Sequence, residues 1–317
     1  MSLPSIAVIG AGLAGLTCAQ TLKEAGTASL VFDKARGPGG RLSSRRRLDT
    51  TLDLGCQAIT ASNPEFQHQL LAWEQQGLVQ PWVEQPTSWC ALPRMSALTR
   101  SLAKNLDLMT STRIQRLEKQ PQDGWVLYDD QNNSWGPFKT VVLATPASQA
   151  APLLEPVAAQ LYSKLIKVQE QPLWVAYAIL PTGLQPTASL LAPTAAELSR
   201  ITCLNSKPGQ QTDLQRWVIE ATPEWSQNNQ DRSPAEVAEM LFDLCKQEPE
   251  FNPLAKPLLL EAHRWLYGRT ANPLGEDFLS DTSEKLYVIG DYCLGSDAEA
   301  AWLAGRRLGK ALRKTVQ

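Results

Sequence analysis

The first residues whose spacing indicates chemistry are three glycines near the N-terminus, Gly10, Gly12 and Gly15, in the pattern G-x-G-x-x-G. Asp33 follows about 20 residues later, at the end of an apolar run. In such a pattern the glycines make a tight turn, admit a pyrophosphate to the backbone and let helix and strand pack closely. The acidic residue accepts hydrogen bonds from ribose hydroxyls. The spacing therefore predicts an adenine-dinucleotide site, with the Leu13 amide among the phosphate donors.

The stretch after Asp33 separates FAD from NAD as the expected dinucleotide. It reads DKARGPGGRLSSRR, and its two glycines with Arg41 resemble the second fingerprint of flavoproteins of the glutathione-reductase and amine-oxidase type, where GGR lies along the FAD pyrophosphate. Further flavoprotein signatures are LDLGCQ (52–57), LATP (143–146) and YVIGD (287–291). The resemblance implies that Asp291 binds the ribityl chain. It also implies that the next helix directs its positive end at the flavin, which stabilises the reduced form by about 0.5 to 2 kcal/mol.

These motifs must be positioned by a parallel sheet. Residues 5–9 are predicted as a strand, 13–25 as a helix and 29–32 as a second strand, which together make a βαβ unit. Buried strands are also predicted at 141–144 and 286–289, before a C-terminal helix that begins near Ala298.

The middle of the chain has a different character. Asn63 and Pro64 predict a helix start, a second helix covers about 95–106, and a β meander fills the stretch to 145. After Pro146, strand-like runs occur at 173–180, 201–204 and 216–222, with one strong helix at the capping box of Ser233 and Glu236. We predict an α/β protein whose Rossmann-type, FAD-binding parallel-sheet domain (1–62, 93–150 and 281–317) carries an inserted mixed α+β substrate domain (63–92 and 151–280).

Composition excludes several other classes. The chain has 317 residues, 43% of them apolar, and a net charge of −2, so it can bury a core but lacks the cationic field for nucleic acid. Six cysteines without a C-x-x-C pair and only two histidines argue against zinc and against a disulfide framework. No apolar stretch is long enough to span a bilayer, and the N-terminus lacks a signal-peptide pattern. We expect a cytoplasmic protein without a metal.

Blocks along the whole chain resemble the bacterial renalases. They include DKARGPGGRLSSRR and LDLGCQAIT near the start, ITCLNSKPGQ, ATPEWSQ and AHRWLYGR in the middle, and GDYCLGSDAEAAWLAG near the end. The resemblance implies a p-hydroxybenzoate-hydroxylase-like fold with non-covalent FAD. It further implies oxidation of the 2- or 6-dihydro isomers of NAD(P)H to NAD(P)⁺, with O₂ reduced to H₂O₂. The chain departs from the family at WCALPRM (89–95) and at Asp297, both near the expected substrate pocket.

Few individual side chains need to do chemistry, because a hydride acceptor needs little from its protein beyond orientation. Gln57 and Ala58 are candidates to face the flavin, with ordinary turn residues as the alternative. Asn205 could bind a carboxamide or simply form a turn. Trp225 and Trp265 offer stacking surfaces, although core packing explains any single tryptophan equally well.

His263 and Trp265 lie two apart in a strand-like run, so they should share a face, either of a pocket or of the core. Arg45, Arg46 and Arg47 are read as a solvated face or a phosphate contact. The predicted substrate contacts are Ala58, Met95, Asn205, Trp225, His263, Trp265 and Ala298. The predicted cofactor contacts are Gly10, Gly12, Leu13, Gly15, Asp33, Lys34, Arg36, Gly40, Arg41, Gln57, Ala58, Ile114, Gly290, Asp291 and Glu299.

Three functions remain open at this point. The first is a renalase-like oxidase of dihydro-NAD(P) isomers, which needs only a small dinucleotide and O₂ as partners. The second is another FAD oxidoreductase, such as an amine oxidase or a desaturase, although the Gln-rich middle domain argues against a lipid substrate. The third is a dinucleotide-binding module without catalysis.

Overall fold

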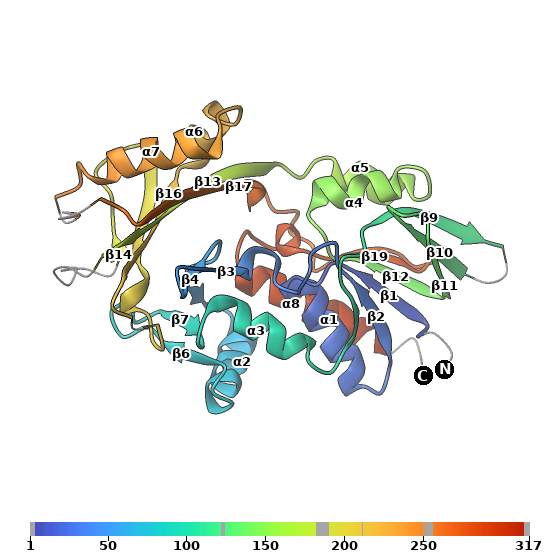
Figure 1. The fold of residues 1–317 in the computed structure, drawn as a ribbon. Coiled ribbons are helices and arrows are strands. Elements are labelled where there is room, and N and C mark those ends of the chain that lie inside the picture. Colours follow the sequence, from blue (N-terminus) through green and yellow to red (C-terminus); the bar gives the residue numbers. More distant parts are fainter. Residues whose placement is uncertain are drawn as a thin grey trace.

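The computed structural model describes residues 4–121, 124–181, 190–210, 212–249, 251 and 256–313. Its first sheet has six strands in the order β18-β19-β12-β1-β2-β8. The middle four, β19, β12, β1 and β2, are labelled in Figure 1. All neighbours in it are parallel except β18 and β19. The strands are β1 (Ile6–Ile9), β2 (Ser29–Phe32), β8 (Asp107–Met109), β12 (Thr140–Leu143), β18 (Leu279–Asp281) and β19 (Leu286–Val288).

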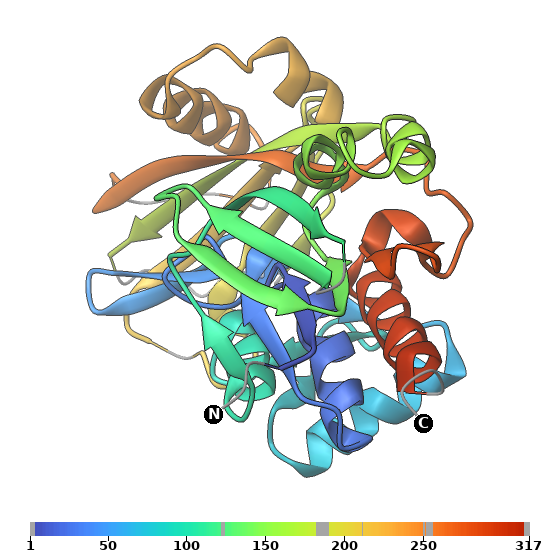
Figure 2. The ribbon, with the colours of Figure 1, turned by 90° about the vertical axis from the view of Figure 1, so that its right-hand side faces the viewer.

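Helices and a small meander cover this sheet. On one side α1 (Leu13–Glu24) packs against α8 (Ala298–Arg313), with α3 (Met95–Ala103) beside α1. The antiparallel meander of β9 (Ile114–Gln120), β10 (Gly124–Asp129) and β11 (Ser134–Phe138) shares the core of the sheet together with α4 (Ala147–Leu154) and α5 (Ala159–Leu165). In Figure 2 the meander, in green, faces the viewer.

A smaller unit follows the second fingerprint. It consists of α2 (Pro64–Gln75) and a sheet of β5 (Ile59–Thr60), β7 (Ser88–Ala91) and β6 (Val79–Pro81). Its core residues Phe66 and Trp73 pack with Leu13 of α1, Met95 of α3 and Trp302 of α8. Residues 63–92, predicted as part of the substrate domain, therefore bury their apolar side chains against helices of the dinucleotide-binding domain.

The second large sheet has the order β14-β15-β16-β13-β17 and is antiparallel. Its outer face packs under α6 (Pro223–Asn228) and α7 (Pro234–Cys245). Its inner face covers Leu52 and Leu54, at the hairpin of β3 (Ser44–Arg47) and β4 (Thr50–Asp53), and this hairpin lies between the two large sheets (Figure 1). The strands are β13 (Glu170–Leu180), β14 (Leu190–Leu191), β15 (Leu198–Cys203), β16 (Gln215–Ala221) and β17 (Leu259–Thr270).

The observed elements agree with the strongest local signals. The βαβ unit, the Asn63 cap of α2 and the capping box of Ser233 and Glu236 are all present. The one strong helix predicted between Pro146 and the C-terminal helix is present as α7, but three further helices, α4, α5 and α6, also form there. These three have only six to eight residues, so tertiary packing stabilises them more than local propensity does. Within the described ranges, no helix is both long and apolar enough to cross a membrane.

Candidate functional site

The glycine fingerprint lies at the carboxyl end of β1, where the chain turns into α1. The Gly10 amide donates to the Phe32 carbonyl oxygen at 2.7 Å. A Cβ atom on Gly15 would lie 2.0 Å from the Gly10 carbonyl oxygen, so the helix can pack this closely only on glycine. A Cβ atom on Gly12 would meet no protein atom within 4 Å. The backbone is therefore tightly packed at the first and third glycines and open at the second.

The start of α1 faces this open space without a side-chain cap. Gly12 is the N-cap residue and has no side-chain acceptor, and the first turn contains no acidic residue. The first amide groups of a helix have no partner within the helix, and the helix dipole adds positive charge there. The start of α1 is thus suited to a phosphate group.

Asp33 ends β2 beside this turn. Its Oδ2 accepts from the Ala11 amide and its Oδ1 from the Ala35 amide, each at 2.7 Å. Burial raises the pKa of Asp33, while these two amides act in the opposite direction. A carboxylate has about four lone-pair positions. Asp33 can therefore hold the two loops together and still accept from a ribose hydroxyl.

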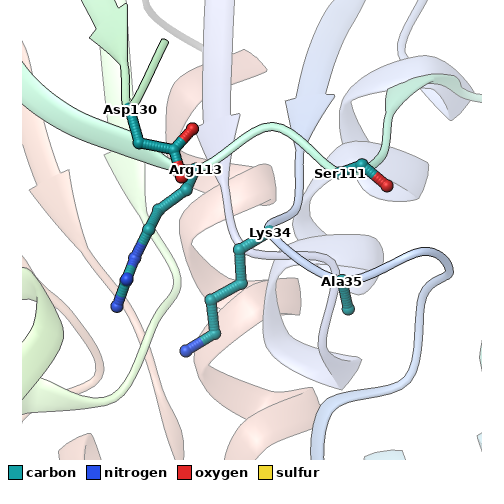
Figure 3. Close-up of a pocket in the computed structure, with 5 residues that line it drawn as sticks. All are labelled: Lys34, Ala35, Ser111, Arg113 and Asp130. Atoms are coloured by element: carbon teal, nitrogen blue, oxygen red, sulfur yellow. The ribbon is translucent and has the colours of Figure 1, made fainter.

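A cavity of about 410 Å³ lies beyond Asp33. It is lined by Lys34, Ala35, Ser111, Arg113 and Asp130, and the side chains of Lys34 and Arg113 extend in the same direction (Figure 3). The cavity has both polar and apolar lining and lies at the end of the βαβ unit where an adenosine is expected.

Arg41 and Asp291, both predicted to contact the cofactor, form a bidentate ion pair. Arg41 Nη1 donates to Asp291 Oδ2 at 2.8 Å, and Nη2 donates to Oδ1 at 2.5 Å. The segment before Arg41 is tied to the fingerprint by the Gly39 amide, which donates to the Ala11 carbonyl oxygen at 3.0 Å. Gly40 approaches Gly12, since its Cβ position is 3.4 Å from the Gly12 Cα. The first fingerprint (10–15), the second fingerprint (39–41) and the Gly290–Asp291 turn before α8 therefore form one continuous surface. We refer to this surface as the wall of the dinucleotide site.

A buried hydroxyl at this wall has no partner within the described residues. It is Oγ1 of Thr145, in the LATP motif. Its side chain borders the fingerprint, because its Cγ2 is 3.2 Å from the Gly10 Cβ position. Buried polar groups are nearly always hydrogen-bonded. The unpaired hydroxyl, the open Gly12 and the uncapped α1 fit an extended, phosphate-bearing dinucleotide.

The segment 54–58 continues the wall under the inner face of the second sheet. The Leu54 carbonyl oxygen accepts from Trp265 Nε1 at 2.9 Å and also from the Tyr177 hydroxyl. The Cys56 amide donates to the Arg41 carbonyl oxygen at 2.8 Å. The segment is thus held by β13 and β17 on one side and by the second fingerprint on the other.

The predicted flavin contact of the Gln57 side chain needs correction. Gln57 is buried, and its Nε2 donates to the carbonyl oxygens of Asp53 (2.9 Å) and Gly55 (2.8 Å). Its Oε1 accepts from Lys207 Nζ at 3.1 Å. Because its amide is fully engaged inside the protein, only the backbone at Gln57 and Ala58 remains available to a ligand.

Sequence reasoning missed a buried polar cluster around Asp53. Asp53 Oδ2 accepts from Lys207 Nζ at 3.0 Å and from Gln210 Nε2 at 2.9 Å. Its Oδ1 accepts from the Ser44 hydroxyl at 2.7 Å and from the Met95 amide at 3.1 Å. Burial alone would raise the pKa of Asp53, but Lys207 and the surrounding hydrogen bonds hold it below its ordinary value. The motifs LDLGCQ and LNSKPGQ contain both partners, although nothing local in the sequence pairs them.

His263 and Trp265 lie on the inner face, as their spacing predicts. Their rings meet edge to face, with centroids 4.7 Å apart. Burial lowers the pKa of His263, and the nearby charge of Arg45 lowers it further. The imidazole is therefore neutral at pH 7. Glu261, two residues earlier, pairs with both Arg45 and Arg47.

Trp225 lies on the other side of the second sheet. It belongs to α6 and packs against the core of the outer face, a cluster that includes Trp174, Ala176 and Phe242. The prediction that Trp225 contacts substrate is therefore corrected. The residues before this tryptophan predict where its helix begins, but they do not indicate which face of the sheet the helix covers.

Three other predicted contacts have structural partners instead. Asn205 Nδ2 donates to the Leu214 carbonyl oxygen at 2.8 Å, and its Oδ1 accepts from the Arg216 amide at 2.9 Å, so it closes a turn. Glu299 accepts from the amides of Ser62 and Asn63 at 2.7 and 2.8 Å and thereby holds the loop before α2.

Met95 is fully buried, with its sulfur 3.4 Å from the Ala91 amide. These three positions are corrected from ligand contacts to structural residues.

The remaining predicted positions lie along the wall or close to it. Ile114 begins β9 just after Thr112, whose amide donates to the Asp33 carbonyl oxygen at 2.9 Å. Arg36 is exposed on the loop after β2, and Ala298 is the half-buried first residue of α8. Gly290 precedes the short helix of Asp291–Cys293.

Comparison with protein families identifies the N-terminal part of the chain. Residues 8–72 match the family model of the NAD(P)-binding Rossmann-like domain. The matched stretch contains both glycine fingerprints and Asp33. The parallel sheet with these motifs is thus a Rossmann-type dinucleotide-binding domain.

Solved structures share the whole fold at low identity. A protein from Exiguobacterium sp. 255-15 assigned as a protoporphyrinogen oxidase has a TM-score of 0.76 at 10% identity, over 99% of this chain and 100% of that one. Cyclohexylamine oxidase from Brevibacterium oxydans IH-35A has a TM-score of 0.75 at 14% identity, over 99% of both chains. A reduced UDP-galactopyranose mutase has a TM-score of 0.74 at 12% identity, over 98% of this chain and 96% of that one. One fold therefore carries several chemistries, and the site must decide the function.

Proposed function

We propose that this protein binds FAD non-covalently and oxidises the 2- or 6-dihydro isomers of NAD(P)H to NAD(P)⁺. The observation that carries the FAD proposal is the continuous wall from the start of α1, through Gly40 and the Arg41–Asp291 pair, to segment 54–58. A dinucleotide along it would place its phosphates at Gly12 and its second ring system under the inner face of the sheet. Two of the similar folds are named as oxidases, which supports a redox cofactor.

Bound FAD would accept a hydride from the substrate and pass both electrons to O₂. The balance is one dihydro isomer, one O₂ and one proton giving one NAD(P)⁺ and one H₂O₂. Only a carbon–hydrogen bond of the substrate breaks, so the reaction needs orientation of the ring more than it needs an acid or a base.

The protein residues supply that orientation. Segment 54–58 is fixed by Trp265 and Tyr177, which gives the reacting ring a rigid wall. The start of α8 follows Asp291, but Asp297 caps it by accepting from the Ala300 amide at 2.8 Å and Glu299 lies in its first turn, so the positive dipole expected there is partly neutralised by the protein's own carboxylates. His263 is neutral and needs no part in proton transfer in this reaction.

Amine oxidation is the second candidate, because one of the similar folds is a cyclohexylamine oxidase. An amine must lose a proton as well as a hydride equivalent, and His263 beside the inner face would be the available base. The charged side chains on that face favour a polar substrate over an apolar amine or a lipid. The cytoplasmic location expected from the sequence stays a prediction.

Anaerobic mixing tests the proposal. The purified protein is mixed with 2-dihydro, 6-dihydro and ordinary 4-dihydro NADH and NADPH, and with a set of amines, while the flavin absorbance is followed. We expect fast bleaching by a 2- or 6-dihydro isomer and slow bleaching by the others. Equal rates with 4-dihydro NADH, or faster bleaching by an amine, would favour the second candidate. A protein that retains FAD but is bleached by no donor would be a binding module.

A further inference from the structure

Three charged side chains from three different strands meet on the inner face of the second sheet. Arg200 of β15 donates to Glu220 of β16 through Nε at 3.0 Å and Nη2 at 2.9 Å. Arg269 of β17 approaches the same carboxylate, with its Nη2 3.4 Å from Glu220 Oε2. The Glu220 side chain is 2% exposed, whereas Arg200 and Arg269 are 31% and 41% exposed. We refer to these residues as the Arg200–Glu220–Arg269 triad.

The backbone directs these side chains toward one point. Arg200 and Glu220 are direct partners in the register of β15 and β16. Arg269 is on β17, which is separated from β16 by β13. Next to Arg269, the pairing of β13 with β17 shifts register between Gln171 and Leu173. Gly268 allows the close approach at this irregularity, because a Cβ atom there would lie 2.6 Å from the Leu173 Cβ. Irregularities of this kind often redirect a side chain next to a functional site.

The triad adjoins the end of the wall that carries segment 54–58. Arg41 Nη1 donates to the Gly268 carbonyl oxygen at 3.4 Å, so the second fingerprint touches the backbone beside Arg269. The Cys56 amide donates to the Arg41 carbonyl oxygen at 2.8 Å, and the charges of Arg200 and Glu220 act on the pKa of the Cys56 thiol in opposite directions. The second fingerprint therefore touches both the backbone beside Arg269 and segment 54–58.

The charge of the triad exceeds what a structural ion pair requires. Two guanidinium groups share one carboxylate, which leaves a net charge of about one positive unit in a partly buried place. In the part of the chain that the structure describes, Arg200 Nη1 and the Nε and Nη1 groups of Arg269 donate to no protein acceptor. Guanidinium groups recognise carboxylates and phosphates through such paired donors. The free donors and the surplus charge both point to an anionic oxygen ligand.

We propose that the triad binds an oxyanion of the substrate, with Glu220 holding the two arginines in place. The inference rests on the proposed function, because that function places the reacting ring beside segment 54–58. For a dihydro-NAD(P) substrate the oxyanion is the bridging pyrophosphate. For an amine substrate it would be a carboxylate.

Calorimetric titration of the FAD-loaded protein at constant ionic strength tests the site without turnover. The probes are NAD⁺, inorganic pyrophosphate and benzoate. The main variant is Arg269→Gln, which leaves the bidentate Arg200–Glu220 pair intact and should fold. Arg269→Lys keeps the charge but removes the planar fork. Arg232→Gln is the matched control, because Arg232 is exposed beside Asn229, at the end of α6 on the outer face.

We expect Arg269→Gln to weaken binding of NAD⁺ and pyrophosphate about tenfold or more, as loss of a charged hydrogen bond does. Arg269→Lys should lie between wild type and Arg269→Gln, and Arg232→Gln should stay within twofold of wild type. Binding of NAD⁺ and pyrophosphate that Arg269→Gln leaves within twofold would overturn the site, as would the absence of binding by all three probes.

The two proposals fail in different ways. Binding of benzoate alone, weakened by Arg269→Gln, would support the oxyanion site and contradict the dinucleotide substrate. Rapid bleaching by a dihydro isomer together with unchanged binding in Arg269→Gln would support the proposed function and overturn the triad as the oxyanion site. Melting temperatures of all variants, measured with FAD bound, establish that each is folded.

Discussion

Lys207 Nζ lies 3.0 Å from Asp53 Oδ2, and both side chains are completely buried. Asp53 ends the hairpin next to the second fingerprint, and Lys207 follows the strand β15 of the second sheet. Lys207 also donates to Gln57, which belongs to the segment proposed to face the reacting ring. The ion pair therefore links the inner face of the second sheet to the wall of the dinucleotide site.

Lys207→Met is expected to lower the free energy of unfolding by about 3 to 5 kcal/mol, because it leaves Asp53 buried without its cation. Urea denaturation of the variant and the wild type measures this. Lys310→Met is the control, because Lys310 pairs with Glu65 at the surface and its loss should cost about 1 kcal/mol or less. The double variant Asp53→Asn with Lys207→Met should lose less than the sum of the two single variants. Additive losses would mean that the two groups do not interact.

The Asp53–Lys207 pair also predicts that the stability of the protein decreases at acid pH. In the folded protein the pKa of Asp53 lies below its ordinary value of 3.8. As the pH falls, Asp53 therefore becomes protonated in the unfolded chain before it does so in the folded chain. The stabilising contribution is complete above pH 3.8 and is lost as the pH falls through the folded pKa. The difference in unfolding free energy between wild type and Asp53→Asn should therefore stay constant from pH 5 to 7 and shrink below about pH 4. A difference that does not change down to pH 3 would contradict the lowered pKa.

Patterns formed by residues close in sequence predicted the dinucleotide domain. Features that depend on contacts between residues far apart in sequence could not be predicted in this way. The fingerprint around Gly10, the Asn63 cap and the two strands beside them depend on residues close in sequence, so their patterns could be interpreted. The contact of Asp53 with Lys207 joins residues 154 positions apart. Which face α6 covers also depends on the whole fold. Trp225 and Asn205 were therefore given functional roles that their tertiary surroundings do not support.

Gly12→Ala and Gly15→Ala should separate cofactor binding from folding. A Cβ atom on Gly12 meets no protein atom, and its φ of −79° suits any residue, so Gly12→Ala should fold but purify with much less FAD. A Cβ atom on Gly15 would overlap the Gly10 carbonyl oxygen, so Gly15→Ala should lower the melting temperature strongly. Chromatography of the flavin released by boiling measures both occupancy and identity. Released FMN, or full FAD occupancy in Gly12→Ala, would contradict the cofactor proposal.

Trp265 and Trp225 offer a matched comparison between the two faces of the second sheet. Trp265→Phe removes the indole donor to the Leu54 carbonyl oxygen, while Tyr177 still donates to it. We expect the concentration of dihydro isomer that half-saturates flavin reduction to rise roughly two- to tenfold, the worth of one hydrogen bond. Trp225→Phe on the outer face should leave it within twofold. Equal effects of the two variants would mean that the inner face does not contact the substrate.

His263→Asn tests the reaction itself, because His263 is the group that an amine substrate would need as a base. Oxidation of a dihydronicotinamide removes a hydride and leaves an aromatic cation, so general-base catalysis, usually worth about 10²-fold or more, has no proton to remove. The variant should weaken substrate binding but leave the limiting rate of flavin reduction within about tenfold, or about 1.4 kcal/mol of the barrier. Because burial and Arg45 lower the pKa of His263, the imidazole stays neutral above its ordinary value of 6.5, and the plateau rate should not change with pH from 7 to 9. Anaerobic stopped-flow saturation curves across that range measure both quantities. A plateau that falls a thousandfold in His263→Asn, or one that titrates like a histidine in the wild type, would mean that the substrate loses a proton in the step, as an amine does.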